Sequence, residues 1–448
     1  MKTLNTLALA VLAIAMAGTG SVSAAVSPEE AAKLKTELTP LGGEKAGNKE
    51  GTIPAWDGGY TKVPAGYKSG QPRPDPFANE KPLLTITAAN MAQYSDKLDE
   101  GQKYLLKKYA DYKINVYPTH RTAAAPQWVY DETFKNATRA KLDGYAVKGA
   151  YGGPPFPIPK SGVEVMWNHA LRVAPGSENW YFRSYVVDSN GSASIGTGGN
   201  NEIQRPYYIK GESPESVEKG FYFAALQSVT EPSVRAGELV IFEDKLDDTR
   251  ASWQYLVGQR RVRRAPNLCC DTPNFVNSGV DFFDEPFVFF GPMDRYDWKI
   301  VGKREMYIPY NMNGFFLKSD KEVTGKHFAN PEYVRWELHR VWEIEGTVRA
   351  GQRDVRARRK IYVDEDSWVA VLGDTFDGQG TLWHTTIAFP TLMYELPALY
   401  MQNMETLDLL KGSYTLTIHN DQKLHHEIVK PFPVSLYTPE GMLNKGVR

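Results

Sequence analysis

Residues 336–348 read WELHRVWEIEGTV, and the character of the side chains alternates along them. One set is mostly apolar and comprises Trp336, Leu338, Arg340, Trp342, Ile344, Gly346 and Val348. The other set holds most of the acidic residues, among them Glu337, Glu343 and Glu345. Because successive side chains of a β-strand point to opposite faces, this pattern predicts a long strand whose apolar face looks inward.

Two further pairs of strands are predicted around this one. Residues 239–242 and 252–257 are strand-like stretches separated by a turn at Asp247-Asp248. Residues 367–372 and 382–389 flank Asp377-Gly378, a dipeptide that favours the positive φ of a hairpin turn. We therefore expect the second half of the chain to be a large antiparallel meander. Its apolar face must be covered by helices, by a second sheet or by curling toward a barrel.

The region before the meander has a different composition. Residues 40–76 are rich in Gly, Pro and Asn, which predicts turns. A helical stretch is predicted from a cap at Thr87 to Tyr109, interrupted near Gly101. Residues 151–159 contain four prolines and predict an irregular connection. We expect residues 25–160 to form a loop-rich and helical region that packs on the body, residues 161–448, in one compact domain.

The first 24 residues have the pattern of a secretory signal peptide. Lys2 precedes an apolar stretch at residues 7–17, and small residues follow up to Ala24. We expect cleavage after Ala24 or Ala25; an uncleaved anchor is the alternative. No later stretch reaches the roughly 18 apolar residues that a membrane-spanning helix requires. The mature chain is therefore expected to be exported and to lack a transmembrane segment.

Charge and cysteine usage exclude several classes of protein. The 448 residues carry 52 Lys+Arg and 53 Asp+Glu, a formal net charge of -1, which provides no overall field for attracting nucleic acid. The two cysteines, Cys269 and Cys270, are adjacent, so an ordinary structural disulfide between them is excluded. Two buried thiols, a vicinal disulfide and an intermolecular bond are the alternatives.

The search for catalytic and metal-binding motifs is negative. His426-Glu427 begins like a zinc-protease motif, but Lys430 occupies the position of the second histidine. The glycine-rich residues 196–201 have neither dinucleotide nor phosphate-loop spacing, and no Gly-x-Ser-x-Gly elbow occurs. Residues 364–366, Asp-Glu-Asp, are interpreted as solvated carboxylates at a turn, with a glycosidase pair as the alternative. We expect no catalytic residue, no metal and no cofactor.

Two groups of residues are candidates for binding a ligand. Six aromatic residues either fill the core or line an apolar cavity, and these are Trp253, Tyr255, Trp336, Trp342, Trp383 and Phe389. Arg261 and Arg263 would share one face of a strand. There they either face solvent or bind an anion at the mouth of a pocket.

Several short motifs are spread over nearly all of the mature chain. They are LGGEKAGNKEGTIPAW (41–56), DPF (75–77), YPTHR (117–121), PFPIP (155–159), WNH (167–169) and GQRRVRRAP (258–266). Together they resemble the DUF1329 family of Gram-negative exported proteins. RKIYVDEDSW (359–368), continuing to DGQG (377–380), is also similar to the strand, turn and strand of LolA/LolB-like lipoprotein-sorting proteins. The chain departs from the commoner DUF1329 pattern at Cys269-Cys270, where an aromatic residue is more usual.

The resemblance implies a mainly β, α+β fold: a large curved antiparallel sheet or half-open barrel, closed by helices, with an interior that holds a hydrophobic molecule in the periplasm. It implies a DUF1302-type outer-membrane protein and an RND-type exporter as partners, and it supplies no catalytic residues. We therefore expect a non-enzymatic periplasmic binding protein, carrier or chaperone for a lipid or other hydrophobic molecule. A periplasmic hydrolase of hydrophobic or carbohydrate substrates and a scaffold of an envelope complex are the alternatives.

Overall fold

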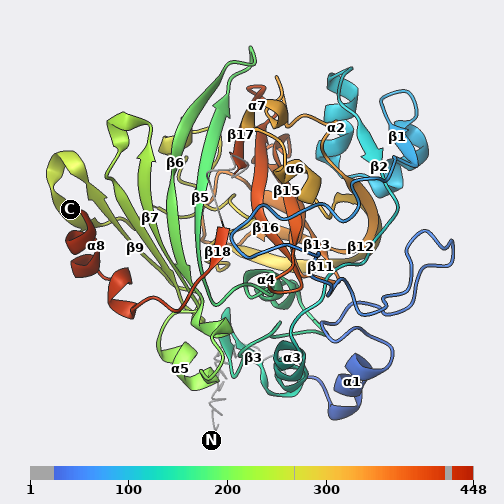
Figure 1. Ribbon diagram of the computed structural model, residues 1–448, viewed down its shortest axis with the longest axis horizontal. Helices are drawn as coiled ribbons and strands as arrows, with labels where there is room; N and C mark the ends of the chain where they lie inside the picture. The colour runs from blue at the N-terminus through green and yellow to red at the C-terminus, as the bar shows by residue number, and fades with distance from the viewer. Residues whose placement is uncertain (1–24, 267, 419–425, 447–448) are drawn as a thin grey trace, which may run out of the picture.

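A computed structural model describes residues 25–266, 268–418 and 426–446 (Figure 1). The predicted signal peptide lies outside the described residues. Most described strands form one continuous path in the order β11 (Tyr296–Pro309), β12 (Trp336–Val348), β13 (Arg358–Asp364), β14 (Ala370–Phe376), β15 (Leu382–Met393), β16 (Ala398–Asp408), β17 (Ser413–Ile418), β5 (Ser177–Val187), β6 (Ala193–Gln204), β7 (Phe223–Glu231), β8 (Leu239–Asp244), β9 (Arg250–Leu256) and β10 (Arg261–Arg264).

The remaining strands are short. They are β1 (Leu84–Ile86), β2 (Ile114–Val116) and β18 (His426–Ile428), which join the large sheet, and β3 (Lys141–Asp143) and β4 (Ala146–Lys148), which form a separate hairpin. The pairings are antiparallel, except for a parallel contact between β2 and β12. The path from β11 to β10 does not return to its start, so the sheet is open. In Figure 1 strands β5–β9 curve away from the central strands β15–β17. The prediction of a mainly β fold with a large curved sheet is confirmed.

Helices are short and lie around the sheet. They are α1 (Pro28–Ala32), α2 (Glu100–Lys108), α3 (Gln127–Arg139), α4 (Gly162–Ala170), α5 (Pro214–Lys219), α6 (Asn313–Phe316), α7 (Asp320–Val323) and α8 (Pro439–Gly446). Single 3-10 turns are η1 (Lys33–Lys35), η2 (Met91–Lys97), η3 (Pro206–Tyr208), η4 (Ser233–Arg235), η5 (Val257–Gln259), η6 (Phe275–Asn277) and η7 (Val434–Tyr437).

The predicted helix from Thr87 to Tyr109 is wrong in detail. The chain instead forms η2 and then α2, whose N-terminus is capped by Asp99 in a reciprocal pair with Gln102. Gly101 does not interrupt α2. A Cβ at Gly101 would lie 2.1 Å from Oγ1 of Thr385, so glycine is needed there because the helix lies directly against the sheet.

Strand β12 forms as predicted, but its N-terminal half has no solvent-facing side; only near its C-terminal end is a residue, Thr347, exposed. Glu337 and His339 are as buried as the apolar residues of the other face. The N-terminal region covers them: the backbone N–H of His120 donates to Oε2 of Glu337 at 2.8 Å, and the Thr119 hydroxyl donates to the Leu338 carbonyl at 2.9 Å. Both faces are therefore buried because a segment distant in sequence supplies the second cover.

The main apolar core joins the two halves of the chain. Leu105, Leu106 and Ile114 belong to the same buried cluster as Ile344 and Phe389. The single compact domain of residues 25–160 and 161–448 stays a prediction.

One loop detail differs from expectation, and the structure selects among the alternatives for the two cysteines. In the β14–β15 hairpin the positive φ occurs at Gly380 (80°), whereas the prediction placed it at Asp377-Gly378. Cys269 and Cys270 form a vicinal disulfide, the second of the three alternatives.

A cavity under the cap segment

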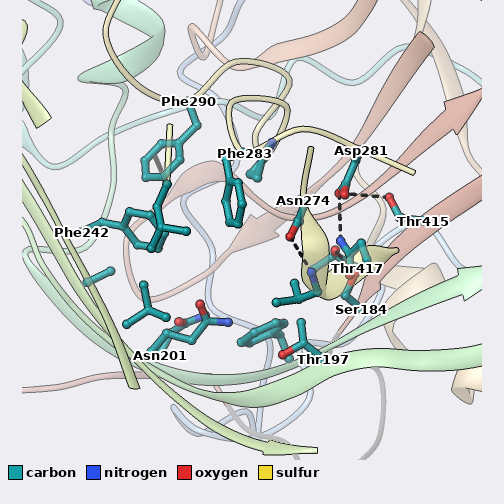
Figure 2. Close-up of a pocket in the computed structure, with 18 of the residues that line it drawn as sticks. Ser184, Thr197, Asn201, Phe242, Asn274, Asp281, Phe283, Phe290, Thr415 and Thr417 are labelled. Atoms are coloured by element: carbon teal, nitrogen blue, oxygen red, sulfur yellow. Dashed lines mark hydrogen bonds between the residues drawn. The ribbon is translucent and has the colours of Figure 1, made fainter. Parts of the chain in front are cut away.

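A cavity of about 160 Å³ lies between the curved sheet and the segment that links β10 to β11 (Figure 2). We call residues 268–295 the cap segment; its described regular structure is the single turn η6 and an isolated bridge between Pro273 and Phe282. The sheet contributes cavity-lining residues from β5–β9, β16 and β17. The cap segment contributes Leu268, Asn274, Phe275, Val276, Asn277, Asp281, Phe283, Pro286, Phe287 and Phe290.

Alternation along β7 explains which side chains reach the cavity. Phe223, Ala225, Gln227 and Val229 line it. Their neighbours Ala224 and Leu226 belong to a second apolar cluster, built with Tyr437 and Met442 of η7 and α8. The C-terminal elements therefore cover one face of this part of the sheet, and the cap segment covers the other.

One end of the cavity is aromatic. The ring of Phe290 lies edge-on to the rings of Phe223, Phe242 and Phe287, at centroid distances of 5.4, 6.0 and 5.6 Å. Figure 2 shows Phe242 and Phe290 together on the side away from Asp281 and Thr415. All four rings also line the cavity, so this end provides apolar surface to an occupant.

The opposite end is polar. Asp281 is 6% exposed, and its Oδ2 accepts hydrogen bonds from Nδ2 of Asn277 at 2.9 Å and from the Thr415 hydroxyl at 3.4 Å. Burial, reinforced by the nearby charge of Glu285, raises the pKa of Asp281 to about 7. The cavity wall therefore contains a buried carboxyl group with a raised pKa.

Buried ion pairs fasten the cap segment to the sheet just after Asp281. Asp284 accepts hydrogen bonds from Arg356 at 2.7 Å and from Arg359 at 2.6 Å. Glu285 accepts one from Nδ1 of His384 at 2.8 Å. Arg356, Arg359 and His384 lie on or beside the sheet and are at most 1% exposed.

The His384 pair makes stability depend on pH. Burial by itself would lower the pKa of His384, but Glu285 and Asp408 outweigh it and raise the pKa to about 9. A raised folded-state pKa contributes stability that is complete below the unfolded value near 6.5 and is lost as pH rises through about 9. The cap segment should therefore be held most firmly below neutral pH.

We expect His384→Gln to lower the free energy of unfolding by about 1.5–3 kcal/mol at pH 6, because it removes the cation that donates a hydrogen bond to Glu285. The difference from wild type should shrink between pH 7 and pH 9.5. Urea unfolding across this pH range measures it, and His327→Gln is the matched control, because His327 stacks on Tyr109 outside this network. A difference that stays constant with pH would contradict the assignment.

None of the six predicted aromatic residues lies in the wall of this cavity. Trp253 and Tyr255 on β9 point to the face that α8 covers, whereas Gln254 between them lines the cavity. The alternation along β9 shows that Trp253 and Tyr255 share one face of the sheet. It does not show which face lines the cavity, because both faces of the sheet are covered. As ligand contacts these residues stay a prediction.

The other four aromatic residues pack within the core or on the cap segment. Trp336 is buried in the main core, Trp342 stacks on Trp368 at 6.3 Å, Trp383 lies edge-on to Phe282 at 5.5 Å, and Phe389 contacts Phe315 at 4.9 Å.

Arg261 and Arg263 lie exposed on the edge strand β10. Nη2 of Arg263 donates to Oε1 of Gln254 at 3.3 Å, so this side chain reaches a residue of the cavity wall. Arg261 lies two positions earlier on the same strand. Their role in anion binding stays a prediction.

The acidic turn is buried, which corrects the interpretation of residues 364–366 as solvated. Arg121 donates to both carboxylate oxygens of Asp366, at 2.7 and 2.8 Å, and Lys303 donates to Glu365 at 2.8 Å. The charges are buried because cations from distant segments pair with them. One oxygen or nitrogen each from His339, Asp364 and Asp366 lie within 4.8 Å of one another, and both Asp366 oxygens already accept a hydrogen bond from Arg121.

Sequence reasoning missed most of the cavity-lining residues. The phenylalanines of the cap segment occur in a stretch without periodicity, and the wall residues Ser184, Thr197, Thr406, Thr415 and Thr417 carry no motif. The aromatic density of FVNSGVDFFDEPFVFF (275–290) was the available signal. Among the described residues, no helix combines the length and apolar character needed to cross a bilayer.

Comparison with known proteins gives one family and a set of similar chains. The family model described as "Protein of unknown function (DUF1329)" matches residues 85–442. The uncharacterized protein PA3922 of Pseudomonas aeruginosa is 40% identical over 449 residues, covering 98% of each chain.

Two solved structures are similar over 63% of this chain. A domain described as an outer membrane lipoprotein-sorting protein from Vibrio parahaemolyticus is 11% identical, with 98% of it covered and a TM-score of 0.43. A DUF1329 family protein from Desulfovibrio piger is 12% identical, with 97% of it covered and a TM-score of 0.42.

Proposed function

The chain belongs to the DUF1329 family, and on this premise we propose that it is a periplasmic binding protein that carries a hydrophobic molecule in the cavity under its cap segment. The observation that carries the proposal is the cavity itself, whose wall is mostly apolar and is closed by a long segment with little regular structure. A concave and mostly apolar pocket with a few polar groups is the usual form of a small-molecule site, so this pocket favours a ligand.

The size of the cavity limits what it holds in this conformation. A dry cavity of about 150 Å³ in another protein accommodates benzene, so 160 Å³ is room for one ring or a short chain. A longer acyl chain requires the cap segment to move. Buried apolar area contributes about 25 cal/mol per Å², which provides moderate affinity for a ligand that must later be released.

The hydrolase alternative receives less support from the geometry. His384 lies between Glu285 and Asp408, the kind of flanking that a general base uses. However, its side chain is 1% exposed and lies outside the cavity wall. A substrate in the cavity would not contact it, so we assign these residues to holding the cap segment.

Location and partners complete the proposal. Export by the predicted signal peptide would place the mature chain in the periplasm, where a DUF1302-type outer-membrane protein and an RND-type exporter would deliver or receive the ligand. A pull-down of envelope proteins tests these partners. Stable capture of them by ligand-free protein would favour the scaffold alternative.

Native mass spectrometry of the purified mature protein tests the binding function. We expect a stoichiometric adduct that solvent extraction releases as a hydrophobic compound, because the cavity excludes water from its aromatic end. A mass equal to the bare chain, unchanged after incubation with an envelope lipid extract, would overturn the proposal.

A further inference from the structure

We propose that the ligand is an amphiphile whose buried head group is a hydrogen-bond donor, a hydroxyl or an ammonium, held by the free oxygen atoms of Asp281, Asn277 and Thr197. This inference rests on the proposed binding function and names the ligand class of the same cavity. The tail of the ligand lies against the aromatic end.

Three unpaired polar atoms at one cavity carry the inference. Oδ1 of Asp281, Oδ1 of Asn277 and Oγ1 of Thr197 are buried and have no hydrogen-bond partner among the described residues. All three residues line the cavity and are at most 6% exposed. Buried polar atoms are nearly always paired, because an unpaired one loses its hydration without compensation. Their grouping in one wall indicates that an occupant supplies the missing partners.

The arrangement favours a donor over an acceptor. The Nδ2 donor of Asn277 is already directed to Oδ2 of Asp281 at 2.9 Å, so its free atom is the carbonyl oxygen. The free atom of Asp281 is also a carboxyl oxygen, and the Thr197 hydroxyl can accept as well as donate. A carboxylate head would bring two further acceptor oxygens to this group.

The neighbouring hydroxyl groups do not change the preference for a head group that donates hydrogen bonds. Ser184, Thr415 and Thr417 lie on the same side of the cavity in Figure 2. The Thr417 hydroxyl donates to that of Ser184 at 3.2 Å, and Thr415 donates to Asp281 at 3.4 Å. The protons of Thr415 and Thr417 are therefore used within the wall. The cation in the wall, Arg235, is paired with Glu238 at 2.6 Å through Nη2, and its buried Nη1 has no hydrogen-bond partner among the described residues. The three free oxygen atoms therefore face a head group together with one free cationic donor.

The two ends of the cavity fix the orientation. Phe242 and Phe290 lie opposite Asp281 across the cavity, with Phe283 between (Figure 2). A head at Asp281 therefore directs a tail toward the rings. One pocket then satisfies both the polar atoms and the apolar surface, as ligand sites with a few precisely placed polar groups do.

Calorimetric titration of the full mature chain with octan-1-ol, octylammonium and octanoate tests the inference, because the three share one tail. We expect the alcohol and the ammonium to bind at least roughly tenfold more tightly than the carboxylate. Asp281→Asn should reduce the preference for ammonium over octanoate by about tenfold. Asp143→Asn makes the same chemical change at an exposed position of β3 and should leave the preference unchanged.

The possible outcomes distinguish failure of the head-group inference from failure of the proposed binding function. Binding of none of the three compounds by wild type would overturn the proposed binding function. Equal binding of all three, unaffected by Asp281→Asn, would overturn the head-group inference alone and would mean that water satisfies these atoms. If Asp281→Asn does not fold, Thr197→Val removes one hydroxyl at nearly constant shape, and an unchanged preference in that variant would count against the inference.

Discussion

Arg356→Ala is expected to lower the free energy of unfolding by about 3–5 kcal/mol, because it removes the cation that three buried carboxylates share. Arg356 donates to Asp284 at 2.7 Å and to Asp354 at 3.0 Å, and Glu285 lies at 3.5 Å. Its own side chain is 0% exposed. Solvent cannot compensate for the loss, so only Arg359 and His384 remain as cations for the three buried carboxylates.

Arg356→Ala should also loosen the cap segment over the cavity, in addition to lowering global stability. Asp284 and Glu285 belong to the cap segment, and Arg356 is one of the groups that fasten them to the sheet. We expect faster hydrogen exchange in residues 268–295 of the variant, measured by mass spectrometry alongside urea unfolding.

Arg358→Ala is the matched control. Arg358 lies two residues further along, is 34% exposed and pairs with the half-exposed Glu345 at 3.2 Å. The loss of such a pair costs about 0–1 kcal/mol. Equal losses in the two variants would show that the buried network does not anchor the cap segment.

Ala225→Trp is expected to abolish ligand binding by filling the cavity. Ala225 lies on β7 and lines the cavity, where its small side chain leaves space in front of the aromatic end. An indole at this position is larger than the single ring that the volume accommodates. We expect affinity for octan-1-ol to fall by at least tenfold, since overlap with the ligand removes contacts outright.

Ala92→Trp makes the same substitution at an exposed residue of η2, outside the cavity wall. Circular dichroism and unfolding curves establish that both variants fold, and calorimetric titration compares their affinities. If Ala225→Trp binds as tightly as Ala92→Trp, the ligand does not enter this cavity.

Arg356→Ala and Ala225→Trp both test how the cap segment and the cavity act together. The cap segment closes the cavity, and buried charges hold the cap segment. Weakening the anchor of that segment should speed ligand exchange, whereas filling the cavity should prevent binding.

The strands could be predicted from the sequence to the extent that their patterns are local. β8, β9 and β12 were identified because apolar runs and alternation depend only on neighbouring residues. The helical stretch was predicted at the right place but with the wrong start, since Asp99 and Gln102 form the cap that Thr87 was expected to provide.

The presence of a site could be predicted from the sequence, but the residues that line it could not. An apolar cavity in a curved sheet was expected, but the aromatic residues chosen for its wall lie elsewhere. Trp253 and Tyr255 illustrate the reason: alternation shows that they share a face, and only the position of α8 decides which face it is.

The sequence by itself therefore determined the mainly β character, the family and the lack of a recognisable catalytic motif, because composition, period and motif are properties of short stretches. The tertiary structure alone decided that Asp364, Glu365 and Asp366 are buried, that the cap segment closes a cavity, and that Asp281, Asn277 and Thr197 meet in its wall. Burial and charge pairing depend on which distant segments come together, and no local pattern records that.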